Sequence, residues 1–397
     1  MSVTPHGTFR SIVWPLAFAE TIVWAAMYYS FPALLLEWEA DLGWSKTELT
    51  GALTISLLVS AAASPFAGRI IDHGHGRILM TGSALCGAFL LFLLSQVTTL
   101  WQFYTVWILL GLAMSGCLYD ACFAILTHTM GDKAKRAITL VTLVAGLAGT
   151  VSFPSANALA ALFGWRVALE VFALVIVVVA VPLFWHASGR AHSHSHHKRL
   201  PVGRKMDAGL RLIRSPLFWC LALCFITMAI NHGVIVNHLL PILDARGVHK
   251  ETAILAISMI GPMQVAGRLA MMAAEKHVTT SIIFMMCTLA AAVASLSLYW
   301  ATVVPALLVS FVLLQGAGHG VVSIVRPVII ADYLGRKDFG LISGVLASIF
   351  LVGFAFAPTI GSLIWEWGGY DRVIAFTCAM ALASFTAVLT ARLIAGR

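Results

Sequence analysis

Charged side chains are scarce in this chain. Of its 397 residues only 11% are Asp, Glu, Lys or Arg, whereas 60% are hydrophobic. Soluble domains have about 25% charged residues. The composition therefore excludes an ordinary soluble domain and predicts a protein that lies in a lipid bilayer.

Patterns that carry enzyme chemistry are also missing. There is no glycine-rich loop to hold phosphate, which argues against an ATP-driven pump, and no nucleophile is spaced to pair with a base. We therefore expect neither an enzyme nor a bound cofactor.

The first apolar run is long and continues into the body of the chain, so we expect no separate cleavable signal. All seven cysteines lie in apolar runs, which predicts no disulfide framework.

The chain has instead a series of apolar runs of about 20 residues or more, the length that a helix needs to cross a bilayer. In hydrocarbon a segment must satisfy its own backbone hydrogen bonds, so these runs are expected to be helices. We predict an all-α membrane protein with twelve transmembrane helices, at residues 12–36, 47–71, 78–96, 101–129, 137–163, 165–185, 216–243, 252–275, 279–300, 302–333, 339–365 and 371–394.

The net charge of +8 is explained by membrane topology and does not indicate a nucleic-acid partner. On the map of predicted spans, nineteen of the 25 Lys and Arg residues fall on one side, five fall on the other, and Arg326 lies inside a span. An excess of Lys and Arg marks the cytoplasmic side. We therefore expect both termini and the loop 186–215 to face the cytoplasm. We also expect the protein to be a monomer and to lie in the cell inner membrane.

The second half of the chain resembles the first. SPFAGR (64–69) and MQVAGR (263–268) occupy matching places, as do the stretches 153–166 and 357–372. Such repeats predict two pseudo-symmetric six-helix bundles, residues 1–185 and 216–397, joined by a polar linker at 186–215. In proteins with this layout, a small-molecule substrate binds at the midplane between the halves.

The stretch GRIIDHGHGR (68–77) resembles the loop signature between helices 2 and 3 of the major facilitator superfamily, through Gly68, Asp72, Gly76 and Arg77. In this interpretation glycine lets two helices approach closely, while the carboxylate and the arginine latch the halves on the cytoplasmic side. Arg268 follows Gly267 in the second half and is expected to copy this latch. The signature concerns fold and gating and does not identify the cargo.

Three further stretches, 20–45, 111–127 and 136–154, resemble a bacterial subgroup that holds riboflavin importers and copper importers serving cytochrome oxidase assembly. DLGWSKTELTGA (41–52) is also similar to the oxalate–formate and monocarboxylate transporters. The resemblance therefore implies a secondary transporter and leaves three cargo classes open: a flavin, copper and a small organic anion.

The seventh predicted span favours copper. Cys220, Cys224, Met228 and His232 step at four-residue intervals, and soft sulfur and imidazole ligands suit Cu(I). The copper importers carry Met-x3-Met in this helix and His-x3-Met in the next, where this chain has Met228-x3-His232 and Met259-x3-Met263. Each pair differs by one residue. Packing and interhelical hydrogen bonds explain the same residue types without a ligand.

Aromatic side chains favour a flavin. Glu20, Trp24, Met27, Tyr28 and Phe31 are expected on one face of the first span, and the fourth span adds aromatic and acidic residues. A flat heterocycle would stack on such faces, and amide and imidazole groups would bind its polar edges. The predicted substrate-binding residues are Trp24, Tyr28, Tyr119, Asp120, Phe123, Asn231, His232, Gln264 and Arg326.

Charges inside spans are costly, at about 2.5–3.5 kcal/mol each on insertion scales, so they usually face a cavity or a partner. Glu20 and Asp120 are the candidates for carrying a coupling proton, and Arg326 for binding an anionic cargo or pairing with Asp120. The histidines of AHSHSHHK (191–198) are interpreted as part of a solvated linker.

We predict riboflavin uptake by alternating access, with copper import as the second hypothesis and organic-anion transport as the third.

Overall fold

The computed structural model describes the chain except for residues 1–5, 131–132, 193–214, 276, 336–338 and 397. The described residues form helices and contain no β-strand. The chain divides into two compact units, Met1–Leu200 and Pro201–Arg397, called unit 1 and unit 2 below. His194, His196 and His197 of the histidine-rich stretch lie outside the described residues, and His192 ends the last helix of unit 1.

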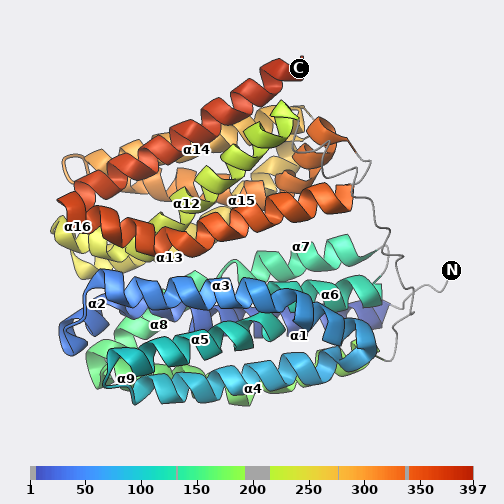
Figure 1. Cartoon of the computed structure of the whole chain (residues 1–397), viewed down its shortest axis with the longest axis vertical. Helices are drawn as coiled ribbons and strands as arrows, with labels where there is room; N and C mark the ends of the chain where they lie inside the picture. The colour runs from blue at the N-terminus through green and yellow to red at the C-terminus, as the bar shows by residue number, and fades with distance from the viewer. Residues whose placement is uncertain (1–5, 131–132, 193–214, 276, 336–338, 397) are drawn as a thin grey trace. The chain divides into compact units, whose positions relative to one another are not determined.

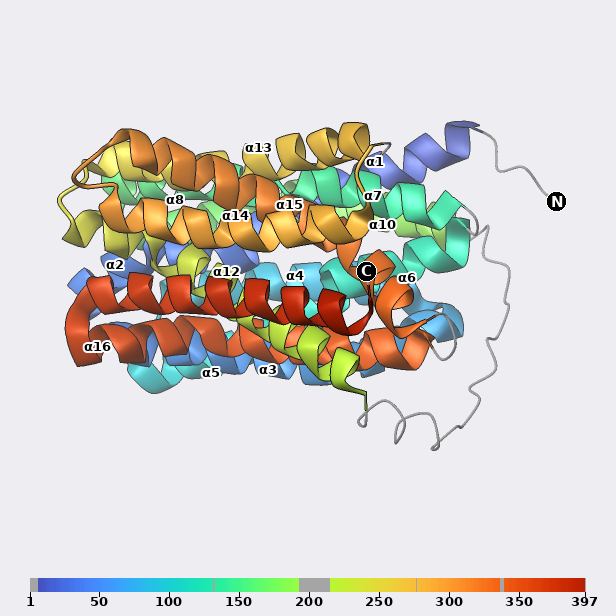
Figure 2. The same ribbon diagram turned by 90° about the horizontal axis from the view of Figure 1, so that it is seen from above.

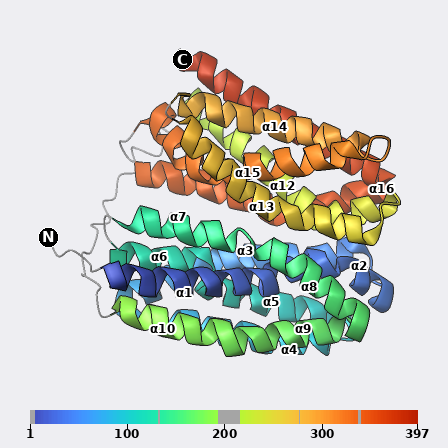
Figure 3. The ribbon, with the colours of Figure 1, turned by 180° about the vertical axis from the view of Figure 1, so that it is seen from behind.

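The helices of unit 1 follow one another with short connections (Figure 1). They are α1 (His6–Trp24), η1 (Ala25–Tyr29), α2 (Ser30–Leu42), α3 (Lys46–Ile70), η2 (Ile71–His75), α4 (Gly76–Ser95), α5 (Leu100–Cys117), α6 (Tyr119–Met130), α7 (Ala134–Ala145), α8 (Ala148–Phe163), α9 (Trp165–Val175), η4 (Ile176–Ala180) and α10 (Val181–His192). Within this unit α1 packs between α7 and α10 (Figure 3).

Unit 2 consists of α12 (Pro216–Ala245), α13 (Lys250–Ala274), α14 (Thr280–Trp300), α15 (Ala306–Leu334) and α16 (Phe339–Ile394). Helix α12 packs along α16 (Figure 2). Helix α16 consists of two arms, which reverse direction at Gly368 and Gly369 (Figures 1 and 2). Gly369 has φ 74°, a left-handed conformation that glycine adopts without steric cost.

Within the described residues, ten helical stretches are long and apolar enough to cross a membrane. Two of them are much longer than one crossing needs, Lys46–Ser95 with 50 residues and Ile342–Ile394 with 53. The first is interrupted at Gly74, with φ 85°, and the second at the reversal of α16. The prediction of an all-helical membrane protein is therefore confirmed.

The turn between α2 and α3 shows how the local sequence sets helix ends. Gly43, with φ 71°, ends α2. Ser45 then caps α3: its hydroxyl accepts a hydrogen bond from the Glu48 backbone N–H at 3.2 Å, and its own N–H donates to the Glu48 carboxylate at 2.8 Å. This capping box satisfies backbone donors that a helix start leaves without partners.

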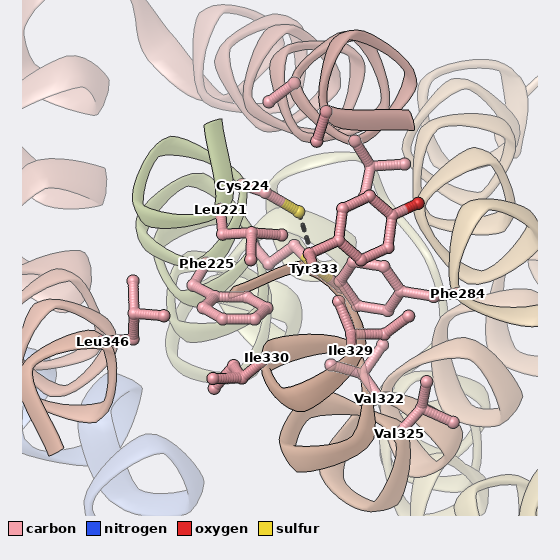
Figure 4. Packing of buried hydrophobic residues seen from close by; sticks show 14 of the residues in the cluster. Leu221, Cys224, Phe225, Phe284, Val322, Val325, Ile329, Ile330, Tyr333 and Leu346 are labelled. Atoms are coloured by element: carbon pink, nitrogen blue, oxygen red, sulfur yellow. Dashed lines mark hydrogen bonds between the residues drawn. The ribbon is translucent and has the colours of Figure 1, made fainter. Parts of the chain in front are cut away.

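An apolar cluster forms the part of the unit 2 core drawn in Figure 4. Phe225 of α12, Phe284 of α14 and Ile329 of α15 are completely buried in it. Cys224 lies in the same cluster, with its thiol 3.8 Å from the Met228 sulfur. Its surroundings support packing as the role of this cysteine, the alternative that the sequence left open.

Glycines bring α13 and α15 into backbone contact. A Cβ on Gly267 would lie 2.9 Å from the carbonyl carbon of Ala317, and one on Gly316 would lie 2.8 Å from the Ile260 carbonyl oxygen. Gly320 faces the backbone of Gln264 in the same way. Small residues at such positions let membrane helices approach closely.

We predict that Gly267→Val lowers the free energy of unfolding by about 1–3 kcal/mol, since the added methyl groups meet backbone that cannot move aside. Thermal melting of the purified full chain in detergent measures the effect. Gly344→Val is the control, because a Cβ on Gly344 meets no atom within 4 Å. Equal losses in the two variants would contradict this account of the α13–α15 contact.

Candidate functional site

Glu20 of α1 is the most completely buried carboxyl group in the described part of unit 1, with none of its surface exposed. The Cys122 thiol and the Trp24 indole lie near it, and Asp120 is within electrostatic reach. Neither carboxyl oxygen has a partner at hydrogen-bonding geometry in the described chain. Burying an ionised carboxylate without a partner is costly, so this position suits a carboxyl group that exchanges a proton.

Asp120, the other acidic residue predicted in this region, is exposed at the start of α6. Its carboxylate accepts a hydrogen bond from the Ser64 hydroxyl at 3.1 Å. The two acids therefore differ: Glu20 is enclosed by protein, whereas Asp120 is open to exchange with its surroundings.

Five aromatic side chains lie in contact beside these acids, and we call them the unit 1 aromatic cluster. The Trp24 ring lies 5.5 Å from Tyr28 and 4.8 Å from Tyr119, measured between centroids. Tyr119 stacks on Phe123 at 5.0 Å, and Tyr28 meets Tyr29 edge-on at 5.0 Å. All except Tyr28 are partly exposed, so part of the cluster is accessible to a ligand.

The predicted aromatic face differs from the observed one at Phe31. The sequence places Phe31 on the same face as Trp24, but it packs with Trp38 and Trp107, at 5.3 and 5.0 Å. The five-residue π-helix η1, Ala25–Tyr29, lies between the two positions. A π-helix turns less per residue than an α-helix, so residues beyond it point in a different direction. Met27 instead packs with Cys117, sulfur to sulfur at 3.9 Å.

Unit 2 holds a small polar cavity with about 10 Å³ of free space, which is about enough for one water molecule. Four helices contribute its lining, which mixes amide, imidazole and sulfur groups: Met228, Asn231, His232, Cys287, Ala291, Gln315, His319, Ala381 and Ser384. A flavin ring is far too large for this cavity.

His319 is the residue that the sequence interpretation missed. Its ring stacks on His232 with 3.3 Å between centroids and 8° between planes. The pattern that could have identified it is Gln315-x3-His319, a polar pair at helical spacing inside an apolar run. Nδ1 of His232 and Oε1 of Gln315 are buried and lack hydrogen-bond partners in the described chain.

Asn231 connects helices. Its amide donates to the Ser295 hydroxyl at 3.2 Å and to the Thr377 carbonyl at 2.8 Å, and Gln315 donates to its oxygen at 3.4 Å. These bonds tie α12 to α14, α15 and α16, the packing role that the sequence analysis weighed against cargo binding.

The second methionine pair and Gln264 do not line this cavity. Met259 of α13 is 36% exposed, and Met263 is partly buried where α13 meets Gly316. Gln264 is buried near the contact with Gly320. The structure therefore brings Met228 and His232 together with His319 and not with the pair predicted from the copper importers. Within the described residues, no three His, Cys, Asp or Glu side chains converge to hold a metal ion.

The two arginines predicted in unit 2 have different partners. Arg268 is buried and donates from Nε to the Gly320 carbonyl at 3.0 Å and from a terminal nitrogen to the Ser323 hydroxyl at 3.3 Å. The Arg326 guanidinium lies over the Phe350 ring, 4.5 Å from its centroid. Both stay predictions as gating and cargo residues, respectively.

The signature residues of 68–77 make contacts inside unit 1. Asp72 pairs with His128 of α6 at 2.8 Å. Arg77 stacks on Trp185 of α10 at 3.5 Å and donates to its carbonyl at 3.1 Å. A Cβ on Gly68 would meet no atom of the described chain within 4 Å, whereas one on Gly76 would lie 3.1 Å from the Ile125 side chain of α6. The gating role of these residues stays a prediction. The backbone needs glycine at Gly74, with its positive φ.

The sequence matches the family model described as Major Facilitator Superfamily over residues 16–276 and 272–395. The chain belongs to the major facilitator superfamily. It is therefore a multi-pass membrane transporter of small molecules and not an enzyme.

Curated relatives of this superfamily share limited identity with the chain. The MFS transporter asaE of Aspergillus flavus is 24% identical over 362 residues, covering 88% of this chain and 78% of that protein. The multidrug resistance protein MdtG of Salmonella dublin is 31% identical over 154 residues, covering 38% of this chain and 35% of MdtG. The riboflavin and copper subgroup is not among these matches and stays a prediction.

Solved structures show the same superfamily fold. A bacterial homologue of the human lysosomal transporter Spinster, inward-facing and unoccupied, aligns with TM-score 0.70 at 13% identity, covering 99% of this chain and 96% of that one. The nucleoside transporter NupG aligns with TM-score 0.68 at 13% identity, covering 96% of this chain and 98% of that one. At these identities the likeness establishes the fold alone.

The Asp72–His128 contact, at 2.8 Å, joins the superfamily signature to α6. Both side chains are exposed, which limits the contribution of the contact to the free energy of unfolding to about 0.2–1 kcal/mol. We predict that His128→Ala lowers the free energy of unfolding by about this amount, because it removes the partner of the Asp72 carboxylate.

Thermal melting of the purified full chain measures this loss. In an Asp72→Asn background the same His128→Ala change should cost less stability, because the carboxylate partner is gone. An equal loss in that background would refute the role of the Asp72–His128 contact.

Proposed function

We propose that this superfamily member is a secondary active transporter of the cell inner membrane that carries riboflavin into the cell by alternating access. The observation that carries the proposal is the unit 1 aromatic cluster, whose partly exposed rings lie beside Glu20 and Asp120. An isoalloxazine ring is flat and largely uncharged, and stacking on aromatic faces is favourable by about 0.5–1.5 kcal/mol per pair beyond the buried area.

The proposed topology has twelve spans and cytoplasmic termini. The two long stretches interrupted at Gly74 and at Gly368–Gly369 each count as two crossings, which raises ten helical stretches to twelve crossings. The asymmetry of Lys and Arg supports a cytoplasmic linker at 186–215 between bundles 1–185 and 216–397.

Copper import is the second candidate, and the unit 2 cavity favours it. The cavity has room for one small occupant, and thioether, thiol and imidazole groups of Met228, Cys287 and His232 line it. These are ligand types that Cu(I) prefers. Against copper, the rings of His232 and His319 lie in nearly parallel planes, 8° apart. Lone pairs that lie in parallel ring planes do not converge on one metal ion, so riboflavin stays first.

Growth tests the proposed cargo. Expressed in bacteria that cannot make riboflavin and lack an importer, the full chain should restore growth on low external riboflavin and raise uptake of labelled riboflavin. Trp24→Leu should raise the KM for uptake about tenfold, because it removes stacking area from the cluster. Trp14→Leu is the matched control, since Trp14 is 43% exposed and stacks only on Phe18 in the described chain.

The opposite result would be copper accumulation without riboflavin rescue. If cellular copper rises with expression and falls in Met228→Ala or His232→Ala while Trp24→Leu has no effect, copper replaces riboflavin as the cargo. Some relatives are named as multidrug resistance proteins, so the direction of transport must be measured as well. Efflux of labelled riboflavin from loaded vesicles is the parallel measurement.

Proton coupling is proposed for Glu20, with Asp120 as the exposed acid that exchanges protons with it. Glu20→Gln keeps the shape but cannot ionise. We predict that it abolishes riboflavin accumulation driven by a pH gradient and retains exchange of external for internal riboflavin. Loss of both activities in a variant that melts normally, or retention of both, would exclude Glu20 as the proton carrier.

A further inference from the structure

Helix α15 carries polar residues along one face, and we call Gln315, His319, Ser323 and Arg326 the α15 polar stripe. Spacings of four, four and three residues place them on one side of an α-helix. Gln315 is buried, whereas His319, Ser323 and Arg326 are partly or fully exposed. The stripe therefore begins at the cavity and runs out to an accessible part of unit 2.

The charge beside this stripe is of one sign. Arg268 donates to Gly320 and Ser323 of α15, and His319 lies within electrostatic reach of Arg268 and Arg326. The acidic residues that the structure describes in unit 2 are all exposed, and none forms an ion pair with Arg326; they are Asp244, Glu251, Glu275, Asp332, Glu366 and Asp371. In a bilayer the Arg326 guanidinium is costly without an anion.

Flat rings frame the stripe. Arg326 lies over Phe350, and Phe350 stacks on Phe354 at 6.4 Å with 7° between planes. Phe354 in turn faces His232, at 6.4 Å and 22°, and His232 stacks on His319. Phe350 and Phe354 are partly exposed. This region thus offers aromatic rings and a guanidinium, next to two buried polar atoms that lack a partner among the described residues, His232 Nδ1 and Gln315 Oε1.

We infer that the α15 polar stripe binds an acidic group of a flat cargo, with Arg326 as the residue that contacts the carboxylate or phosphate. A guanidinium binds such groups with two parallel hydrogen bonds. This inference rests on the proposed transport of a flat aromatic cargo and adds a charge class to it. Acidic members of that class, such as riboflavin 5′-phosphate, bind better than neutral members, riboflavin included.

Binding to matched pairs of an acid and its neutral analogue tests the inference. The full chain is placed in phosphatidylcholine vesicles, and binding is measured by tryptophan fluorescence for riboflavin 5′-phosphate against riboflavin and for nicotinate against nicotinamide. The acid of at least one pair should bind about tenfold tighter or more. Arg326→Gln should abolish that preference while binding of the neutral member is kept, which shows that the variant is folded. Arg326→Lys should retain part of it.

Arg372→Gln is the matched control, because Arg372 also lies over an aromatic ring, Trp367, at 4.2 Å, but outside the stripe. It should leave the preference for acids unchanged. Equal binding of acid and neutral analogue by the unmodified chain, or a preference that survives Arg326→Gln, would overturn the inference.

The anion could also come from lipid. Adding phosphatidylglycerol to about a quarter of the vesicle lipid should leave the acid preference intact. If phosphatidylglycerol instead abolishes the preference for acids, and does so only when Arg326 is present, the guanidinium binds a lipid phosphate. The proposed role of Arg326 in cargo binding is then wrong. The two proposals can fail separately. If the chain prefers nicotinate through Arg326 but binds no flavin, riboflavin is wrong as the cargo and the α15 polar stripe still binds acids. If the chain takes up riboflavin but shows no preference for acids, only the inference about the α15 polar stripe is wrong.

Discussion

Hydrocarbon offers no hydrogen bonds, and this single constraint organises the whole molecule. Backbone groups satisfy it by forming helices. Many hydroxyl side chains bond to the preceding turn of their own helix, as Thr227 does with the Leu223 carbonyl at 2.8 Å, and other polar side chains bond to a neighbouring helix. Asn231 does so through Ser295 and Thr377, and Ser152 does so through the Ala25 carbonyl at 2.7 Å. Against that background the exceptions are informative, because a buried polar group without a partner is costly unless a ligand, a proton or water completes it.

Two regions that hold such exceptions have opposite chemistry. In unit 1, Glu20 is an enclosed acid next to the unit 1 aromatic cluster. In unit 2, the surplus is basic, with Arg268 and Arg326 beside the stacked pair of His232 and His319. In the proposed mechanism the enclosed acid exchanges a proton and the basic face binds an anion. Each proposal rests on contacts within its own unit.

Much of the architecture could be predicted from the residues. Helices follow from apolar runs longer than 20 residues, and the α2–α3 turn follows from Gly43, Ser45 and Glu48. The aromatic residues Trp24, Tyr28, Tyr119 and Phe123 were predicted as one group and lie together. The four-residue spacing within each pair follows from the helical period, whereas packing sets the contact between Trp24 of α1 and Tyr119 of α6. Phe31 was misplaced because the π-helix Ala25–Tyr29 changes the phase, and hydropathy does not reveal such a change.

The sequence by itself determined that this chain is helical, lies in a membrane and resembles the major facilitator superfamily, because hydropathy, charge asymmetry and short signatures are properties of neighbouring residues. Only the tertiary structure decided which distant side chains meet. It placed His319 against His232 in place of Met259 and Met263, gave Asp72 a histidine partner and left Gly68 without a close contact. The physical reason is that each of these contacts joins helices whose rotation is set by packing across the bundle, and no local pattern encodes that rotation.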